Sequence, residues 1–205
     1  MEDTKTDGRR TAPGRQAHWA EPAWREQFYS LTLLPETEAG EALRRMTSAL
    51  QPDDGPRQVP YPMPDIPLAT FTGREAMEET LTRWMQRICA NLKRFSLTLG
   101  EPGLLPDGTL RMKVMDPASL KRLTDRLDVL ETYIRSCGTG PVEWVRNPLC
   151  RIGKANPAMG RTAIPTMEGL RSMEGLFPVH CLLLEKRMHP GDGGEKVYLS
   201  PFMPG

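Results

Sequence analysis

The chain has 205 residues, of which 39% are hydrophobic and 26% charged, with 27 basic and 26 acidic side chains and a formal net charge of +1. That length suffices for one ordinary domain with a hydrophobic core, or for two small lobes that share one. A net charge this small excludes a long-range field that would draw the whole protein onto nucleic acid or a membrane, so any anion site must be local.

Targeting segments and metal motifs are not evident in the sequence. No run of about 18 apolar residues is present to span a membrane, and the first residues lack the hydrophobic core of a signal peptide. The four cysteines, Cys89, Cys137, Cys150 and Cys181, are widely spaced and form no Cys-x-x-Cys pair. We therefore expect reduced thiols, no metal, no cofactor and a cytoplasmic location.

The chain is expected to begin with a tail and then one folded domain. Residues 1–26 are rich in charged, glycine, proline and small side chains, which is typical of disorder. The domain, 27–205, starts with a predicted strand at 28–34, where aromatic and other hydrophobic residues run up to a proline. A helix is predicted at 36–50 from apolar residues at steps of three and four. A proline-rich loop at 51–67 follows.

The rest of the chain alternates between helical and strand patterns. Two long segments repeat apolar residues at helical spacing, and the first has glutamates early and basic residues late. Shorter segments alternate apolar and polar residues with the period of two of a strand. The pattern predicts a helix at 74–93, strands at 95–99 and 110–114, a helix at 117–137, strands at 179–185 and 196–199, and no assignable element at 153–175.

A proline-led motif of strand-like composition occurs twice, as PLATF at 67–71 and PLCRI at 148–152. Side chains at i and i+2 of a strand point to the same face. Each motif should therefore present one pair of side chains together. These pairs are Leu68 with Thr70, and Leu149 with Arg151.

This layout resembles the duplicated Pro-His-x-Thr-hydrophobic motif of the two-histidine phosphoesterase superfamily. From residue 28 to about 199, the order of elements is similar to the bacterial 2′-5′ RNA ligase-like branch, with added detail at 78–85, 95–99 and 179–187. The resemblance implies an α+β fold. It would have two pseudo-symmetric βαβ-like lobes, mostly antiparallel sheets around a central cleft, and helices on the outside.

The resemblance also implies a reaction for which this chain lacks the residues. In the family, two histidines act as general base and general acid on one phosphodiester, and the hydroxyls hold its oxygens, usually without a metal. Here Leu68 and Leu149 stand in the histidine places, and Arg151 stands where the second hydroxyl should be. Since leucine transfers no proton, we expect no catalytic residue at the motif positions. The cyclic phosphodiesterase or 2′-5′ RNA ligase activity of the family is therefore not carried over.

The side chains that remain suit binding. A guanidinium such as that of Arg151 can grip phosphate through two hydrogen bonds but cannot act as a base. Thr70 keeps its hydroxyl, and Arg146 and Lys154 flank the second motif with further positive charge. Our leading hypothesis is a catalytically degenerate protein that binds a phosphate ester, a nucleotide or an RNA end, with no membrane and no metal partner.

Two alternatives stay open. Leu68 and Leu149 could close the old cleft, leaving a protein-interaction module, although they could also form an apolar floor beneath a nucleobase. An active phosphodiesterase could recruit His180, on a predicted core strand, although a structural histidine is the commoner case. Cys150 should face away from its two motif neighbours and lie in the core, which argues against a cysteine nucleophile.

Overall fold

The computed structural model describes residues 26–48, 63–115, 117–154, 175–188 and 194–204. The expected tail, most of the proline-rich loop and most of 153–175 lie outside these ranges. The described helices are α1 (Thr37–Ser48), the short 3₁₀ helix η1 (Glu75–Met77), α2 (Glu78–Cys89) and α3 (Pro117–Ser136). The described strands are β1 (Gln27–Pro35), β2 (Ile66–Gly73), β3 (Phe95–Leu104), β4 (Thr109–Val114), β5 (Glu143–Trp144), β6 (Leu149–Lys154), β7 (Gly175–Arg187) and β8 (Glu195–Pro201).

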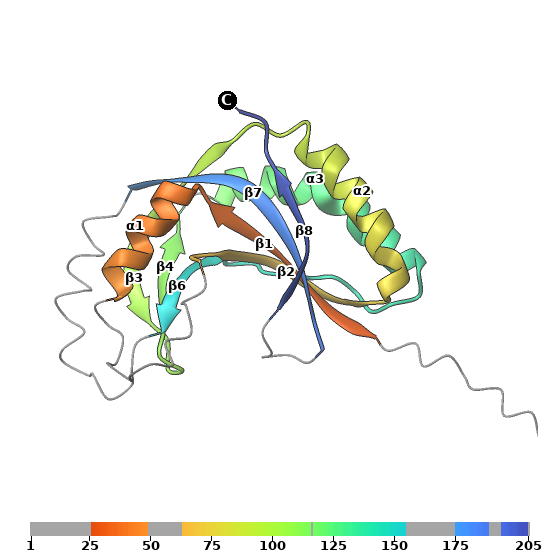
Figure 1. Cartoon of the computed structure of the whole chain (residues 1–205), viewed down its shortest axis with the longest axis horizontal. Helices are drawn as coiled ribbons and strands as arrows, with labels where there is room; N and C mark the ends of the chain where they lie inside the picture. The colour runs from red at the N-terminus through yellow and green to blue at the C-terminus, as the bar shows by residue number, and fades with distance from the viewer. Residues whose placement is uncertain (1–25, 49–62, 116, 155–174, 189–193, 205) are drawn as a thin grey trace, which may run out of the picture.

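The described strands form one eight-stranded sheet in which every ladder is antiparallel. The order is β5-β2-β1-β7-β3-β4-β6, and β8 pairs with β7 outside this path. The sheet is strongly curved, with α1 beside β3, β4 and β6 at one end and α2 and α3 at the other (Figure 1). An isolated bridge between Asp65 and Arg151 joins the start of β2 to β6, near the far end of the strand order. The predicted α+β class is therefore confirmed, and both motif strands belong to one continuous sheet.

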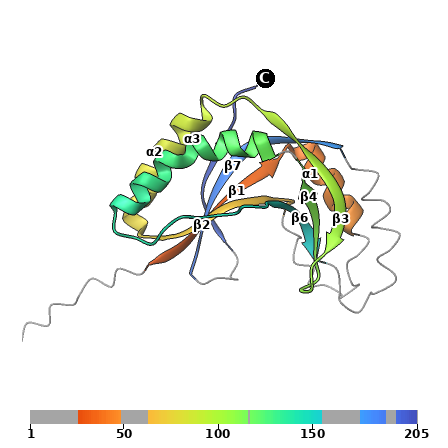
Figure 2. The same cartoon turned by 180° about the vertical axis from the view of Figure 1, so that it is seen from behind.

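Helix α2 covers one face of the sheet because both surfaces are apolar. Strand β1 buries Tyr29, Leu31 and Leu33, and the Tyr29 hydroxyl donates a hydrogen bond of 2.9 Å to Oε1 of Glu78 on α2. Helix α3 lies next to α2 on this side (Figure 2). Each large apolar side chain buried in this way contributes about 1.5–3 kcal/mol of transfer free energy. The buried residues of the two helices are Leu81, Met85, Cys89, Leu120, Leu123, Leu127, Leu130 and Ile134.

The second motif strand is fixed by its pairing with β4. Cys150 lies opposite Met112 of β4, and both are fully buried. By strand alternation, Leu149 and Arg151 point to the other face, where they lie opposite Lys113 and Arg111. The prediction that Cys150 lies in the core is confirmed.

Most predicted elements are present, and the differences have simple causes. The helix predicted at 74–93 starts with one 3₁₀ turn and ends at Cys89. Strand β5 was not predicted because two residues are too few to show an alternating pattern. No described helix is long and apolar enough to cross a membrane.

Candidate functional site

The sheet has a second face that is polar along three neighbouring strands. Thr70 of β2 lies opposite Ser30 of β1, and Ser30 lies opposite Glu185 of β7. Directly opposed residues of antiparallel strands point to the same face. Thr32 and Arg187 extend this row by alternation along β1 and β7. We call these five residues the polar surface, and they point away from the face that Tyr29 presents to α2.

Several polar atoms of this surface are buried without a hydrogen-bond partner. Among the described residues, none reaches the hydroxyls of Ser30 and Thr32 or the Nε of Arg187. The Arg187 guanidinium does contact Glu185, with 3.3 Å between Nη2 and Oε2. An unpaired buried polar group costs about 1–3 kcal/mol.

Gly194, just before β8, lies against the same two charged side chains. A Cβ at this position would lie 3.1 Å from the carboxylate carbon of Glu185 and 3.3 Å from Nε of Arg187. A larger residue would therefore displace the Glu185–Arg187 pair. The close approach of the backbone is a reason for glycine here.

Arg151 is held by Asp65, the residue that precedes β2. Its Nε donates a 2.8 Å hydrogen bond to Oδ1, and its Nη2 donates to Oδ2. The backbones of the same two residues exchange hydrogen bonds of 3.0 and 2.7 Å. The Arg151 guanidinium thus already forms, with Asp65, the pair of hydrogen bonds that the sequence predicted for a phosphate.

The charges around this pair, including that of Glu185 on the polar surface, affect the pKa values of both partners. Burial raises the pKa of Asp65, the hydrogen bond from Arg151 opposes that change, and the Glu185 carboxylate raises the pKa further. The hydrogen bond from Arg151 to Asp65 raises the pKa of Arg151, and Glu185 adds to the effect. Glu185 therefore lies within electrostatic reach of the pair as well as beside Ser30. The charge of Glu185 therefore acts both on the polar surface that includes Thr70 and on Arg151.

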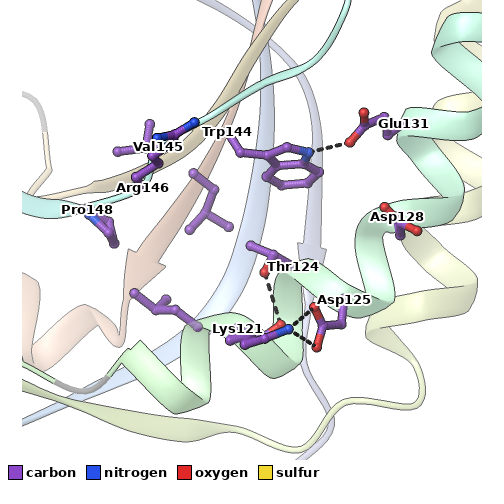
Figure 3. A pocket seen from close by; sticks show the side chains of 11 residues that line it. Lys121, Thr124, Asp125, Asp128, Glu131, Trp144, Val145, Arg146 and Pro148 are labelled. Atoms are coloured by element: carbon purple, nitrogen blue, oxygen red, sulfur yellow. Dashed lines mark hydrogen bonds and ion pairs between the residues drawn. The ribbon is translucent and has the colours of Figure 1, made fainter.

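Leu68 and Arg146 meet elsewhere, in a hollow of about 430 Å³ between α3 and the chain around β5 (Figure 3). Leu68 has no direct partner on β1, because the register shifts between Leu31 and Thr32. It is only 2% exposed, whereas Thr70 is exposed. We call this cavity the α3 hollow. Its lining includes Leu68, Leu120, Trp144, Val145, Arg146 and Pro148, together with polar residues of α3.

The remaining candidates from the sequence lie outside both places or at their edge. Leu149 is half-buried opposite Lys113. Lys154 ends β6, and its side chain is not among those described. His180 is half-buried on β7, where its carbonyl accepts a 2.7 Å hydrogen bond from the amide of Phe202. It is five residues from Glu185 on that strand, which corresponds to about 16 Å at the rise of an extended chain.

Asp65 and four of the five polar-surface residues are not among the candidates predicted from the sequence. Ser30 and Thr32 occupy i and i+2 positions of an otherwise apolar strand, which is a readable signal. Glu185 and Arg187 give no such signal, because Lys186 between them makes a continuous run of charges. The strand order that brings these pairs together was not readable. In the described part of the chain, no group of three or more His, Cys, Asp and Glu side chains could hold a metal ion.

Comparison with known proteins identifies the fold. No protein-family model and no curated protein matches the sequence. The crystal structure of E. coli LigT complexed with 3′-AMP is similar to 86% of this chain and 98% of its own, with 15% identity and a TM-score of 0.54. The apo form of E. coli LigT (15% identity, 87% and 96% coverage, TM-score 0.49) and Kluyveromyces marxianus Usb1 (17%, 83% and 97%, 0.43) are also similar. The first comparison shows that the chain has the LigT fold, as the sequence resemblance implied.

Proposed function

We propose that this chain is a member of the two-histidine phosphoesterase superfamily that has lost its acid–base pair and binds a nucleotide or an RNA end on the polar surface. The observation that carries this proposal is the row of polar side chains on the face away from the helices, Ser30, Thr32, Thr70, Glu185 and Arg187. In this row the hydroxyls of Ser30 and Thr32 and the Nε of Arg187 have no hydrogen-bond partner among the described residues. The LigT fold supports it, since LigT itself was crystallised with 3′-AMP.

The charges of this surface favour a phosphate that carries one negative charge. Arg187 is held by Glu185 at one point, through Nη2, and its Nε has no partner among the described residues. Arg151 is held by Asp65 at two points, so Arg187 is the better placed of these two arginines to contact a ligand. Glu185 lies next to Arg187 and would repel a second negative charge on the ligand. A phosphodiester or a cyclic phosphate should therefore bind better than a terminal phosphate that carries two charges.

Proton transfer has no evident agent at this surface. Leu68 and Leu149 stand in the motif positions of the family's histidines. Asp65 is clamped by Arg151 through both carboxylate oxygens, and Glu185 is paired with Arg187. Groups held in this way are poorly placed to shuttle a proton. The ligand should be bound and released unchanged.

A second candidate function is a protein-interaction module whose cleft has closed. The burial of Leu68 against α3 favours it, because a leucine at that site fills space that a polar residue would keep open. The two candidates differ in what they require of Arg187. Loss of its charge should matter for anion binding and should be immaterial for a closed module.

Calorimetric titration tests the proposal. Wild-type protein is titrated with 2′,3′-cyclic AMP, which has one charge, and with 3′-AMP, which has two at pH 8. We expect saturable binding that is tighter for the cyclic compound, and a loss of about tenfold or more in Arg187→Gln. Ser30→Ala removes one hydroxyl and no charge, so it should weaken binding less than Arg187→Gln does.

The matched control is Arg83→Gln, since Arg83 is an exposed arginine on α2 paired with Glu79. It should bind like the wild type. No heat with either nucleotide at millimolar concentration would overturn the proposal. Equal affinities of Arg187→Gln and Arg83→Gln would also overturn it.

A further inference from the structure

The α3 hollow lies on the helix side of the sheet, apart from the polar surface. Trp144 of β5 lies opposite Ala69 of β2, and Ala69 lies opposite Leu31, so the three share the face that the helices cover. At about 430 Å³ the hollow falls within the range of small-molecule sites.

The hollow has a rigid aromatic wall. Nε1 of Trp144 donates a 2.5 Å hydrogen bond to Oε2 of Glu131 on α3. Arg135 donates a 2.5 Å hydrogen bond to Oε1 of the same carboxylate. Glu131 is thus used on both oxygens and holds the indole in one orientation. Val145, which is 39% exposed, adds apolar surface. An aromatic wall fixed in advance lowers the entropic cost of binding a flat or apolar ligand.

Two opposite charges in the hollow have no partner among the residues that the structure describes. Lys121 and Asp125 satisfy each other, with Nζ–O distances of 2.8 and 2.9 Å. That leaves Asp128 and Arg146, whose side chains make no hydrogen bond or ion pair with another described residue. Figure 3 shows Arg146 beside Val145, and Asp128 on α3 on the other side of Trp144. The hollow therefore has a positive end, an apolar middle and a negative end.

We propose that the α3 hollow binds a small zwitterion with an apolar or aromatic body, such as an unblocked dipeptide. Its ammonium group pairs with Asp128, its carboxylate pairs with Arg146, and its body lies against Trp144 and Leu68. A nucleotide is a poor fit because it is negatively charged. The lining of the hollow has three carboxylates and only two cations, so it would repel a nucleotide. This site does not depend on anion binding at the polar surface.

An NMR titration tests the site, with the indole Nε1–H resonance of Trp144 as the readout. The probe is phenylalanyl-leucine in three forms: unblocked, N-acetylated to remove the ammonium, and C-amidated to remove the carboxylate. We expect the unblocked form to bind about two- to fivefold more tightly than either blocked form, because each lost charge removes one ion pair with an exposed side chain.

Variants connect each end of the probe to one residue. Asp128→Asn should weaken the unblocked and amidated forms and leave the acetylated form unchanged. Arg146→Gln should weaken the unblocked and acetylated forms and leave the amidated form unchanged. Both positions are exposed, so both variants should fold. Glu79→Gln and Arg83→Gln, an exposed pair on α2, are the matched controls and should change nothing.

Three results would contradict binding of a zwitterion in the α3 hollow. If the indole resonance does not move at millimolar concentrations of the unblocked dipeptide, the proposal is wrong. Equal affinity for the three forms would contradict it too, since the charges would then play no part. So would variants whose effects do not follow the blocked end of the probe.

Discussion

Arg151 contacts both carboxylate oxygens of Asp65, and the backbones of these two residues also exchange two hydrogen bonds. Asp65 immediately precedes β2, and Arg151 lies on β6, so the contact joins the two strands that carry the duplicated motif. Arg151 is therefore a structural residue that holds the curved sheet together. A phosphate would have to compete with Asp65 for its guanidinium.

Asp65→Asn should lower the free energy of unfolding by about 1–3 kcal/mol. Removing one partner of a fully buried ion pair costs more, but Arg151 is 41% exposed, so water compensates part of the loss. Urea denaturation measures the change. Arg151→Thr should be similarly costly, because it leaves the mostly buried Asp65 without its partner.

The control for this prediction is the exposed ion pair of Glu36 and Arg94, with 3.3 Å between Oε1 of Glu36 and Nη1 of Arg94. Glu36→Gln should cost about 0–1 kcal/mol. The double variant Asp65→Asn with Arg151→Gln should be less destabilised than the sum of its single changes, since neither charge is then left alone. An Asp65→Asn protein as stable as Glu36→Gln would show that the pair does not hold the sheet.

Thr32→Val should leave the folded protein as stable as the wild type or make it more stable by about 1 kcal/mol. The valine has the same shape, and the hydroxyl that it replaces is buried without a partner among the described residues. Thermal unfolding provides the measurement. Thr98→Val on β3, where the threonine is exposed, is the matched control and should be close to neutral. Marked destabilisation by Thr32→Val alone would mean that the hydroxyl is satisfied.

The Trp144–Glu131 hydrogen bond should weaken in acid, at a pH below the ordinary pKa of glutamate, because protonation removes the charge of the acceptor. The hydrogen bond from Trp144 lowers the pKa of Glu131, desolvation partly opposes this change, and the hydrogen bond from Arg135 lowers the pKa further. A lowered pKa means that the ionised form is stabilised by folding. This stabilisation is present above pH 4.5 and is lost as the pH falls through the lowered value.

The indole Nε1–H resonance of Trp144 should report this transition, with a midpoint below 4.5. The transition should be absent in Glu131→Gln, which can still accept a hydrogen bond but does not ionise. Glu143→Gln, an exposed neighbour on β5, should keep it. A midpoint at or above the ordinary value would contradict the assignment.

Cysteine reactivity should follow burial. Desolvation raises the pKa of the Cys150, Cys181 and Cys89 thiols, and that of Cys181 reaches about 11. Cys137 is half-buried at the end of α3. Brief treatment of the folded protein with iodoacetamide at pH 8, followed by mass spectrometry, should modify Cys137 first. Modification of Cys150 ahead of Cys137 would contradict its place in the core.

Much of the fold can be predicted from the sequence because its signals are local. Apolar residues at regular spacing revealed the helices and most strands, and the two motifs pointed to the LigT fold. Pairings between distant residues were beyond its reach. Nothing in the sequence near Arg151 indicates that its guanidinium will bind Asp65. The register shift opposite Leu68 cannot be predicted either, because it depends on how β2 pairs with β1. Thr70 was identified, but the hydroxyl beside it on Ser30 required knowledge of the strand order.

The most direct test of binding without turnover is ³¹P NMR of 2′,3′-cyclic AMP mixed with equimolar protein, because one spectrum reports both events. We expect the cyclic phosphate resonance to shift or broaden in a saturable way, less so with Arg187→Gln, and no monophosphate resonance to grow beyond that of a protein-free sample. A monophosphate resonance produced by the wild-type protein would contradict the loss of catalysis. A cyclic phosphate resonance unchanged by the protein would contradict binding.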